Sequence, residues 1–560
     1  MNQFTALSGL SSPTIRIIGA CNLYGITFDG DYLYAIDTTN GHLFQINLST
    51  GYTTIVNTEA WSEFIGVTGI AIAQGELWFT RDEDIYVCPF DPDHFEFKPE
   101  LFARTPRTAD GIAITDNTVY VTSQRSGYIH IFNKTQKAEI THLYAPGIGV
   151  ENITVRGEEI WVSDRTEQTV FCLDRATGET IFSVLTPFES PTGLAFYPDP
   201  ETGKELLYVA YADSEVYIRD NPNAEPNYEI QYRDRTFIHP LYFHFNPQDK
   251  YALSNGYLVE LSYVEELAPL DVVELEDLEW RIALPAETDR QRIRSIEPVG
   301  LPFTEEVQEG QRVAVFKFDH LNQNQRYIFG WKAIVELWSI KYQLTPPDCE
   351  TLPNHSEEFT AKYLVDNDNL AMESEIIVKA AKESIQNETN LLRQMYSIRN
   401  YVYDRLSYGI KPHIDPPDIA LRRGVGSCGE YLGVLLALSR LNGIASRTVG
   451  RYKCPLKPDL RYISLVPDFN HVWMEFYVPG FGWVPMETNT DDVREGGPYP
   501  TRFFMGLSWY HTEMAKGIPF EVIRKDGVKI PKEEVSIGEL AINHVQFVIL
   551  EELDPSAVRS

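Results

Sequence analysis

Short runs of alternating apolar and polar residues, broken by Gly, Asp or Asn, recur along the first half of the chain. Comparable runs begin at Gly25, Gly69, Gly111, Asn152 and Gly193, at steps of 44, 42, 41 and 41 residues. Each unit holds short strand-like pieces joined by turn residues. A period of ~40 residues with about four strands per unit is typical of a β-propeller. Because a weaker unit follows at 237–263, we expect about six blades over residues 1–262, with five or seven as alternatives.

The pattern changes twice after the repeats. Residues 268–345 alternate apolar with polar positions, as in RVAVFKFDHL, and this predicts a small β-sandwich. The proline-containing acidic run from Thr345 predicts a linker. Apolar residues then recur at helical spacing before strands return, which predicts an α+β domain over residues 355–510. Residues 511–560 form a β-rich extension to which the pattern assigns no role.

Composition narrows the classes of partner. The chain has 48 basic and 80 acidic residues, a formal net charge of −32. Such a surface repels phosphate groups, so we expect neither nucleic acid nor a membrane as a partner. The six cysteines form no CxxC pair, which argues against a disulfide framework or a structural zinc site. The first residues lack the pattern of a signal peptide, and we expect a cytoplasmic protein.

One cysteine lies in a context that suggests chemistry. In RRGVGSCGEYLGVLLALSRLNG, Ser427 is a good N-cap and Gly443 a good C′ residue, so a buried apolar helix is predicted over about 428–442. Cys428 then lies in the first turn, where the helix dipole lowers the pKa of a thiol. The flanking Gly426 and Gly429 leave room for a substrate. Taken alone, Cys428 is better explained as a small buried residue that fills a gap, and only the residues downstream favour a catalytic role.

A histidine and a carboxylate are predicted to meet further along the chain. In HVWMEFYVPGFGWVPME the apolar residues Val472, Met474, Phe476 and Val478 alternate, and the PGFG run predicts a turn. A hairpin centred on Gly480 brings the apolar faces together and places Glu487 opposite Trp473. His471 is then its diagonal neighbour on the same polar-facing surface, ~7–8 Å away between backbones. A general base and its orienting acid need that arrangement.

These segments together resemble the transglutaminase-like core, part of the papain-like cysteine enzyme group. The resemblance covers about 355–500 and rests on four motifs that follow one another in the family's order. They are the helix start with Gly426, Cys428, Glu430 and Tyr431; the strand GIASRTVGR from Gly443; the strand with His471, Trp473 and Glu475; and the segment with Gly482, Trp483 and Pro485. It implies Cys428 as nucleophile, His471 as base and Glu487 as orienting acid. The family usually has aspartate at that last position, so Asn489 and Asp491 are fallback orienters.

The resemblance leaves the oxyanion donor open. The backbone N–H of Cys428 is the default, and Tyr408, Trp473 and Asn489 are further candidates for this role or for supporting the triad. The repeats of the first half resemble the NHL and SMP-30-like propellers through their G-[IL]-A-[IF] strands. RIALPAETDRQRIRSI resembles the β-domain that precedes such cores in some bacterial proteins.

The predicted activity is cysteine-dependent acyl transfer on protein or peptide amide bonds, through an acyl-thioester. Hydrolysis, as in a protease or amidase, is favoured because water is always available. Transglutaminase cross-linking is one alternative, and a non-catalytic scaffold whose propeller binds a protein partner is another. Cys428, Cys454, His471 and Glu487 have ligand types that suit zinc, but their spacing fits no standard zinc motif. The run DNDN from Asp366 resembles the start of a calcium loop but lacks its glycine and closing glutamate. We therefore expect no cofactor.

Overall fold

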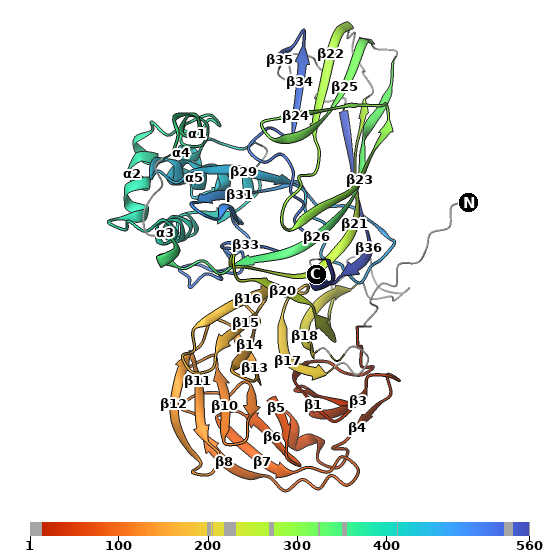
Figure 1. Cartoon of the computed structure of the whole chain (residues 1–560), viewed down its shortest axis with the longest axis vertical. Helices are drawn as coiled ribbons and strands as arrows, with labels where there is room; N and C mark the ends of the chain where they lie inside the picture. Colours follow the sequence, from red (N-terminus) through yellow and green to blue (C-terminus); the bar gives the residue numbers. More distant parts are fainter. Residues whose placement is uncertain are drawn as a thin grey trace, which may run out of the picture. The chain divides into compact units, whose positions relative to one another are not determined.

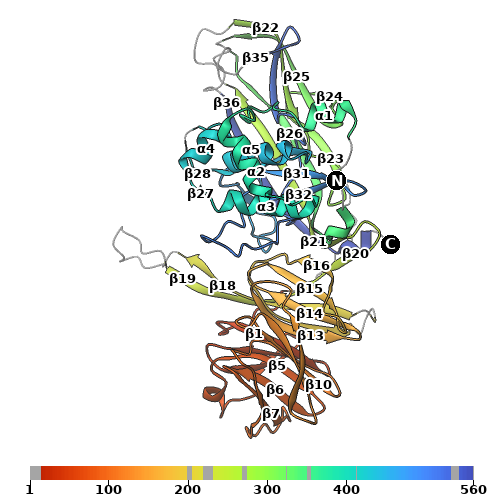
Figure 2. The same ribbon diagram turned by 90° about the vertical axis from the view of Figure 1, so that its left-hand side faces the viewer.

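The computed structural model describes residues 14–198, 203, 205–217, 231–267, 274–322, 325–349, 355–411, 413–530 and 541–558. The described chain divides into two compact units, residues 14–245 and residues 246–558. We call them the N-terminal unit and the C-terminal unit. Figures 1 and 2 show the N-terminal unit as small sheets and the C-terminal unit as longer sheets with a group of helices.

The N-terminal unit consists of five antiparallel sheets in chain order. Four of them have four strands: β1–β4 (Leu23–Asp29, Tyr32–Asp37, His42–Asn47, Thr53–Ile55), β5–β8 (Val67–Ala73, Glu76–Arg81, Asp84–Pro89, Glu100–Arg104), β9–β12 (Ile112–Ile114, Thr118–Ser123, Tyr128–Asn133, Ala138–Tyr144) and β13–β16 (Val150–Arg156, Glu159–Asp164, Thr169–Asp174, Thr180–Leu185). The fifth contains β17–β19 (Pro191–Pro198, Glu205–Tyr217, Gln231–Leu241). A short 3-10 helix, η1 (Trp61–Phe64), follows β4.

The repeated glycines lie where the first strands of neighbouring sheets approach one another. A Cβ on Gly69 would lie 2.7 Å from the carbonyl oxygen of Asp110, and one on Gly193 would lie 1.8 Å from that of Tyr24. Only glycine permits backbones this close. Strand β1 thus contacts both β5 and β17, so the first and fifth sheets are neighbours.

Threonine hydroxyls also link successive sheets. Thr80 Oγ1 donates to the carbonyl oxygen of Asp110 at 2.9 Å, and Thr122 Oγ1 donates to that of Glu151 at 2.7 Å. Thr192 Oγ1 makes the corresponding bond to Leu23 at 2.7 Å, from the fifth sheet to the first. The sequence period therefore reflects a repeated contact between sheets as well as a repeated strand pattern.

The sixth repeat expected at 237–263 does not form a sheet of its own. Its first residues belong to β19, which pairs with β18. Its last residues belong to β21 (Tyr251–Leu267), which pairs with β26 (Tyr327–Tyr342) and β36 (Ala541–Leu553) in the C-terminal unit. The described residues of the N-terminal unit thus contain five sheets, where the pattern suggested about six. Strand β20 (Phe243–Asn246) spans the boundary between the units in the chain.

Two large sheets form the β part of the C-terminal unit. The first has the order β23-β26-β21-β36-β30, with β33 paired to β26; the second has the order β24-β25-β22-β34-β35. Rings of Trp280 and Phe316 lie 5.2 and 5.0 Å from the ring of Phe329. The remaining strands are β22 (Glu274–Ala283), β23 (Gln291–Gly300), β24 (Thr304–Gln308), β25 (Gln311–Asn322), β26 (Tyr327–Tyr342), β30 (Ser464–Leu465), β33 (Gly506–Leu507), β34 (Glu521–Lys525), β35 (Val528–Ile530) and β36 (Ala541–Leu553).

The region predicted as a separate sandwich at 268–345 therefore shares its sheets with later residues. Strand β36 lies between β21 and β30, and β34 pairs with β22. The segment 511–560, expected as an extension, supplies these strands. Such pairings join residues far apart in the chain, which alternation alone does not reveal.

Helices cover one side of a small sheet in the rest of this unit (Figure 2). The sheet has the order β29-β31-β32, from Ser446–Arg451, His471–Val478 and Gly482–Met486. The helices are η2 (Pro346–Cys349), α1 (Glu357–Tyr363), α2 (Glu375–Ile385), α3 (Leu391–Tyr403), α4 (Pro417–Arg423), α5 (Cys428–Leu441) and α6 (Pro555–Val558), with short strands β27 (Ser407–Tyr408) and β28 (Val425–Gly426). No helix among the described residues combines the length and apolar character that crossing a bilayer requires.

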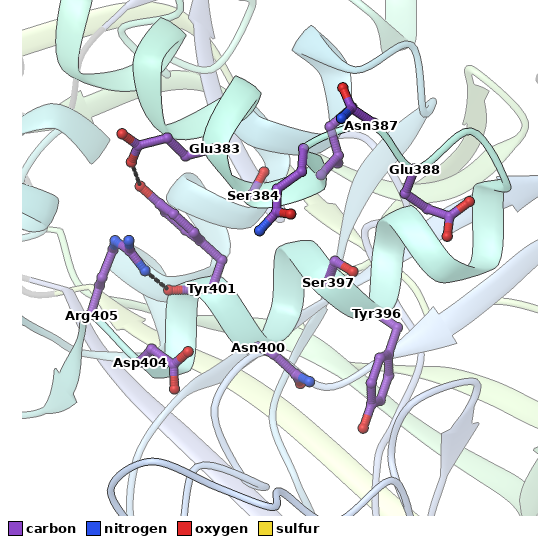
Figure 3. Close-up of a pocket in the computed structure, with 12 residues that line it drawn as sticks. Glu383, Ser384, Asn387, Glu388, Tyr396, Ser397, Asn400, Tyr401, Asp404 and Arg405 are labelled. Carbon is purple, nitrogen blue, oxygen red and sulfur yellow. Dashed lines mark hydrogen bonds between the residues drawn. The ribbon is translucent and has the colours of Figure 1, made fainter.

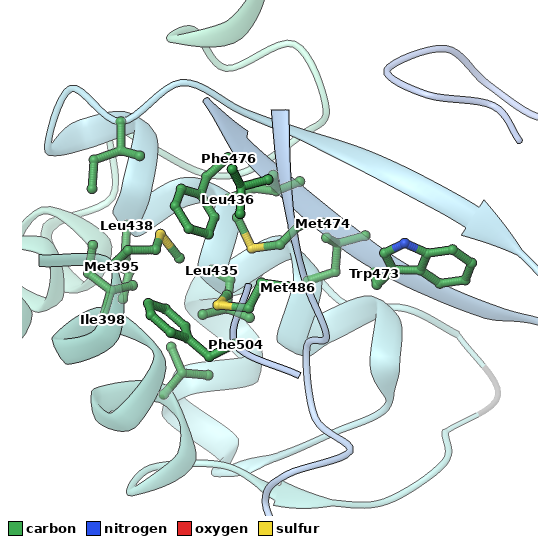
Figure 4. Close-up of a cluster of buried hydrophobic side chains, with 14 of the residues drawn as sticks. Met395, Ile398, Leu435, Leu436, Leu438, Trp473, Met474, Phe476, Met486 and Phe504 are labelled. Atoms are coloured by element: carbon green, nitrogen blue, oxygen red, sulfur yellow. The ribbon is translucent and has the colours of Figure 1, made fainter. Parts of the chain in front are cut away.

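Helix α5 is the centre of this region. It contacts α2, α3, α4 and β31. Figure 4 shows Leu435 and Leu436 packed among Met474, Phe476 and Met486 from the sheet, all of them buried. A helix surrounded by apolar side chains is fixed in position, so its first turn is a rigid place for a reactive group.

Candidate active site

The first turn of α5 is held by its own caps and by one buried acid. Glu430 Oε2 accepts from the backbone N–H of Ser427 at 2.8 Å, and Arg423 Nη2 lies 3.1 Å from its other oxygen. This explains why the motif has an acid two residues after the cysteine. At the other end, the N–H groups of Gly443 and Ile444 bond to Arg440 and Ser439 in a Schellman pattern. The predicted helix is confirmed to within one residue.

The two glycines beside Cys428 do not leave open space. A Cβ on Gly429 would lie 2.7 Å from Cδ1 of Ile414, and one on Gly426 would lie 2.8 Å from Cβ of Glu430. An added Cβ would thus meet Ile414 or Glu430, and the prediction that these glycines make room for a substrate stays a prediction. Cys428 itself is partly exposed.

The hairpin has the predicted register. Met474 pairs with Met486 and Phe476 with Val484, which centres the turn on Gly480. Glu487 follows β32 directly, and its carboxylate contacts Nε2 of His471 at 2.8 and 3.1 Å. His471 and Glu487 are therefore a hydrogen-bonded pair. The charge on the imidazole also acts on the thiol of Cys428 and lowers its pKa. Nδ1 of the ring is buried and has no hydrogen-bond partner among the described residues.

The charges of these three groups support one another. Burial works to raise the pKa of the Cys428 thiol, but its interactions with His471 outweigh burial and hold the pKa below its ordinary value. Burial works to lower the pKa of His471, and the charge on Glu487 raises it above its ordinary value. Burial opposes the charge on Glu487 too, yet His471 and Lys453 keep its pKa well below the ordinary range. The trio favours a thiolate beside an imidazolium.

The face that carries His471 and Glu487 is buried, not open to solvent as the alternating pattern suggested. His471 is 3% exposed and Glu487 is fully buried. The segment 510–517 runs along the edge of β29, where the N–H of Gly450 bonds to Met514 and that of Gly517 bonds to Thr448. Glu475, on the same face, pairs with Arg447 and Lys516. The polar alternation therefore reflects buried polar contacts rather than exposure to water.

The other predicted site residues have different places. Tyr408 pairs with Gly426 in a parallel bridge and is 45% exposed. Burial raises the pKa of its phenol, and the negative charges on Cys428 and Glu487 raise it further. The ring of Trp473 is buried between those of His471 and His511, at 6.2 and 5.0 Å. Asn489 accepts from Thr488 Oγ1 at 3.2 Å.

The fallback orienter Asp491 is used elsewhere. Its carboxylate binds Arg502 at 2.9 Å and the N–H of Phe503 at 3.2 Å. The structure gives it no contact with His471, whereas Glu487 has two. Among the candidate acids, Glu487 is the one that the geometry brings to the histidine.

The residues considered for metal binding have other partners. Cys454 donates to the carbonyl of Pro455 at 3.6 Å, and burial raises its pKa. In the DNDN segment, Asp366 accepts from the N–H groups of Leu370 and Met372, and Asn367 accepts from Arg440 at 2.6 Å. Within the described part of the chain, no set of three or more His, Cys, Asp or Glu side chains is arranged to hold a metal ion.

Two grooves lie on the helical side of this region. The larger, of 1010 Å³, runs between α2 and α3 and includes Tyr401 and Arg405; Tyr401 donates to Glu383 at 3.0 Å (Figure 3). None of the predicted catalytic residues lines it. A smaller groove of 380 Å³ is lined by Tyr408 and by the acids Asp404, Asp492 and Glu495. The second groove thus includes Tyr408, whose pKa the charge on Cys428 helps to raise.

Sequence reasoning missed three residues that contact the site or support it. His511 Nε2 lies 2.7 Å from Oε1 of Glu487, and Lys453 Nζ lies 3.4 Å from the same oxygen. Arg290 binds the backbone carbonyls of Ser508 and His511 at 2.8 and 2.9 Å. His511 follows two aromatic residues in WYHTEM, and no spacing in the sequence connects it to Glu487.

Comparisons with known proteins agree with the motifs. The Transglutaminase-like superfamily matches residues 378–488, which include Cys428, His471 and Glu487. This superfamily includes cysteine proteases and transglutaminases. The comparison with curated proteins finds no match.

Similar solved structures are distant. A proposed cysteine protease from Cytophaga hutchinsonii is 14% identical over 54% of this chain and 93% of its own, with a TM-score of 0.38. A glutaminyl cyclase from Myxococcus xanthus is 11% identical over 39% of this chain and 92% of its own, with a TM-score of 0.27. A nidogen–laminin complex is 13% identical over 31% of this chain and 83% of its own, with a TM-score of 0.25. With TM-scores this low, none of these similarities carries an argument.

Proposed function

We propose that this chain, with a transglutaminase-like domain at residues 378–488, is a cysteine-dependent acyl-transfer enzyme that hydrolyses protein or peptide amide bonds. Cys428 is the nucleophile, His471 the general base and acid, and Glu487 the residue that orients the imidazole. The observation that carries the proposal is the contact of His471 with Glu487, whose carboxylate lies 2.8 Å from Nε2, together with the lowering of the Cys428 pKa by the imidazole.

The proposal gives each group a step. With Nε2 of His471 bonded to Glu487, the buried Nδ1 is the ring nitrogen left for the thiol proton. The thiolate attacks the amide carbonyl carbon, a C–S bond forms, and the carbonyl electron pair moves to oxygen. The intermediate collapses as the C–N bond breaks, and the imidazolium gives its proton to the departing nitrogen. Water then attacks the acyl-thioester, gives a proton to His471, and the thiolate leaves.

The negative oxygen of the intermediate needs a donor. The backbone N–H of Cys428 is the first candidate because it lies at the free N-terminus of α5. Tyr408 is the second: it lies beside Gly426 and feels the charge on Cys428. Trp473 and Asn489 support the triad instead, since Trp473 packs against His471 and Asn489 bonds to the residue after Glu487.

The N-terminal unit is proposed to be a five-bladed β-propeller of the NHL or SMP-30 kind that binds protein partners or substrate. Support comes from the five successive sheets and from the contact between β1 and β17. We place the protein in the cytoplasm and assign it no cofactor, no nucleic acid and no membrane partner. The six cysteines, which are all free in the structure, are consistent with a reducing compartment.

The test is alkylation of the cysteines by iodoacetamide as a function of pH, followed at each site by mass spectrometry. Cys428 is expected to react well below the pH at which an ordinary thiol reacts, and His471→Ala should remove this advantage. Cys88 and Cys172 are internal controls, because burial raises the pKa of each to about 12. A Cys428 that reacts like an ordinary thiol, without dependence on His471, contradicts the proposal.

Substrate assays then separate the two reactions. Hydrolysis predicts cleavage of peptides, or ammonia release from glutamine peptides, that is independent of added amine and absent in Cys428→Ala. Cross-linking predicts incorporation of a labelled primary amine into a glutamine peptide at the expense of hydrolysis.

A further inference from the structure

Glu487 is shared by two histidines. Oε1 lies 2.8 Å from Nε2 of His471 and 2.7 Å from Nε2 of His511. Oε2 accepts from the backbone N–H of Thr488 at 3.0 Å and also contacts His471 at 3.1 Å. Lys453 Nζ lies 3.4 Å from Oε1 and adds a positive charge beside the carboxylate. A fully buried carboxylate is thus surrounded by donors.

His511 has one proton to donate and two acceptors in reach. Its Nδ1 lies 3.1 Å from the carbonyl oxygen of Ser508, while Nε2 lies 2.7 Å from Glu487. Burial lowers the pKa of His511 to about 3, so the ring is neutral at ordinary pH and carries one N–H. A bond to a charged acceptor is stronger than one to a carbonyl, and the Glu487 contact is the shorter. The proton therefore belongs on Nε2.

In this tautomer Nδ1 carries no proton and faces the carbonyl oxygen of Ser508, and Arg290 offsets this unfavourable contact. Its Nη2 donates to the carbonyl of Ser508 at 2.8 Å, the same oxygen that Nδ1 of His511 faces. Its Nη1 donates to the carbonyl of His511 at 2.9 Å, its Nε donates to that of Trp338, and Glu513 balances its charge at 3.1 Å. The guanidinium is buried, so these bonds fix residues 508–513 against β26. Arg290 lies far outside the matched residues 378–488, and so does His511.

We propose that His511, held in place by Arg290, is a positioning residue of the active site: it donates to Glu487 and fixes the carboxylate toward His471. This rests on the proposed function. It explains why glutamate can stand where aspartate is usual in the family, because the longer side chain reaches a point between the two imidazoles. It also makes the β part of the C-terminal unit necessary for an active site whose motifs lie elsewhere.

The test compares His511→Leu and His511→Gln with the wild type in the full chain. The measured quantity is the alkylation rate of Cys428 against pH. Leucine removes the donor, so Oε1 is free to turn away and the imidazolium is less stabilised. We expect an alkylation rate about tenfold lower at pH 6, with its midpoint moved to higher pH. The amide N–H of glutamine can take the place of Nε2–H, and His511→Gln should recover a rate within about threefold of the wild type.

A matched control comes from another buried histidine. His130 is 3% exposed, and its Nδ1 lies 2.8 Å from Glu139 in the N-terminal unit. His130→Leu removes a similar contact and should leave the midpoint of Cys428 alkylation unchanged. A midpoint for His511→Leu equal to that of the wild type overturns the inference, and so does a midpoint for His511→Gln that moves as far as that for leucine. If Cys428 is not activated even in the wild type, the proposed function itself fails.

Discussion

His471 and His511 approach the same oxygen of Glu487, at 2.8 and 2.7 Å, from different parts of the chain. His471 begins β31, whereas His511 lies in the segment that covers the edge of the same sheet. The acid of the proposed triad is therefore held from both sides. This arrangement leads to expectations for pH dependence and for substitutions.

The first prediction concerns pH. The thiolate forms as pH rises through the lowered pKa of Cys428, and the imidazolium is lost as pH rises through the raised pKa of His471. Acyl transfer needs both, so kcat/KM should be bell-shaped, with limbs on either side of a broad maximum between these two pKa values. Alkylation of Cys428 should show the acid limb without the alkaline fall. An activity that rises only near pH 8.5, the ordinary pKa of a thiol, contradicts this.

The same shifts affect stability. Glu487 has a lowered pKa in the folded chain, so its contribution is present above its unfolded pKa of about 4.3 and is lost as pH falls through the folded value. His471 has a raised pKa, so its contribution is present below about 6.5 and is lost as pH rises through the folded value. In Glu487→Gln both dependences should weaken, which urea unfolding at several pH values can measure.

Glu487→Gln should also reduce catalysis. The amide keeps the shape but loses the charge that raises the pKa of His471. We expect kcat to fall by about 10²- to 10⁴-fold and Cys428 alkylation to need higher pH. Glu487→Asp is the matched control: it keeps the charge but shortens the reach toward His471 and His511, so its loss should be smaller. Equal losses in the two variants would mean that the charge itself is not what matters.

Tyr408→Phe tests the oxyanion donor. If the phenol stabilises the intermediate, kcat should fall by up to about 10²-fold while KM stays unchanged, because the bond forms only after the thiolate has attacked. Tyr462, which is 75% exposed, supplies the control Tyr462→Phe, in which kcat should not change. A wild-type kcat in Tyr408→Phe would leave the backbone N–H of Cys428 as the donor.

Gly193→Ala tests the contact between the first and fifth sheets. The new Cβ would lie 1.8 Å from the carbonyl oxygen of Tyr24, so one strand must shift. We expect a loss of about 1–3 kcal/mol in the free energy of unfolding of the N-terminal unit, followed by thermal unfolding. Gly157→Asn is the control, because Gly157 has φ 57° and open space around it, and asparagine tolerates that conformation. An unchanged unfolding temperature in Gly193→Ala would contradict the close approach.

Local signals in the sequence predicted the parts of the site that depend on neighbours in the chain. Ser427 and Gly443 mark the ends of α5, and the turn at Gly480 sets the register that brings Glu487 to His471. Each of these features is decided within about twenty residues. The same reasoning found the repeat, because its period reflects glycines that recur at the same close approach.

The features that the sequence did not predict depend on contacts between residues far apart in the chain. Residues 251–263 alternate like those of the repeats, yet they pair with β26 and β36. The face of β31 that carries His471 is polar in the sequence, yet it is buried, with His511 packed against Trp473 and Lys516 paired with Glu475. His511 and Arg290 carry no pattern of their own, because their role depends on carbonyl groups and a carboxylate that folding brings to them. Alternation reports which side chains share a face and does not report what covers that face.

The place of His511 after Cys428 and His471 in the chain bears on the timing of protein synthesis. A ribosome adds residues in order, so the emerging polypeptide contains the thiol and its base before it contains the histidine that completes the support of Glu487. Strand β36, which lies between β21 and β30, is made later still. If Cys428 is the nucleophile, as proposed, the nascent chain carries it while the site is unfinished, and we expect full reactivity only when the later segments have folded into place.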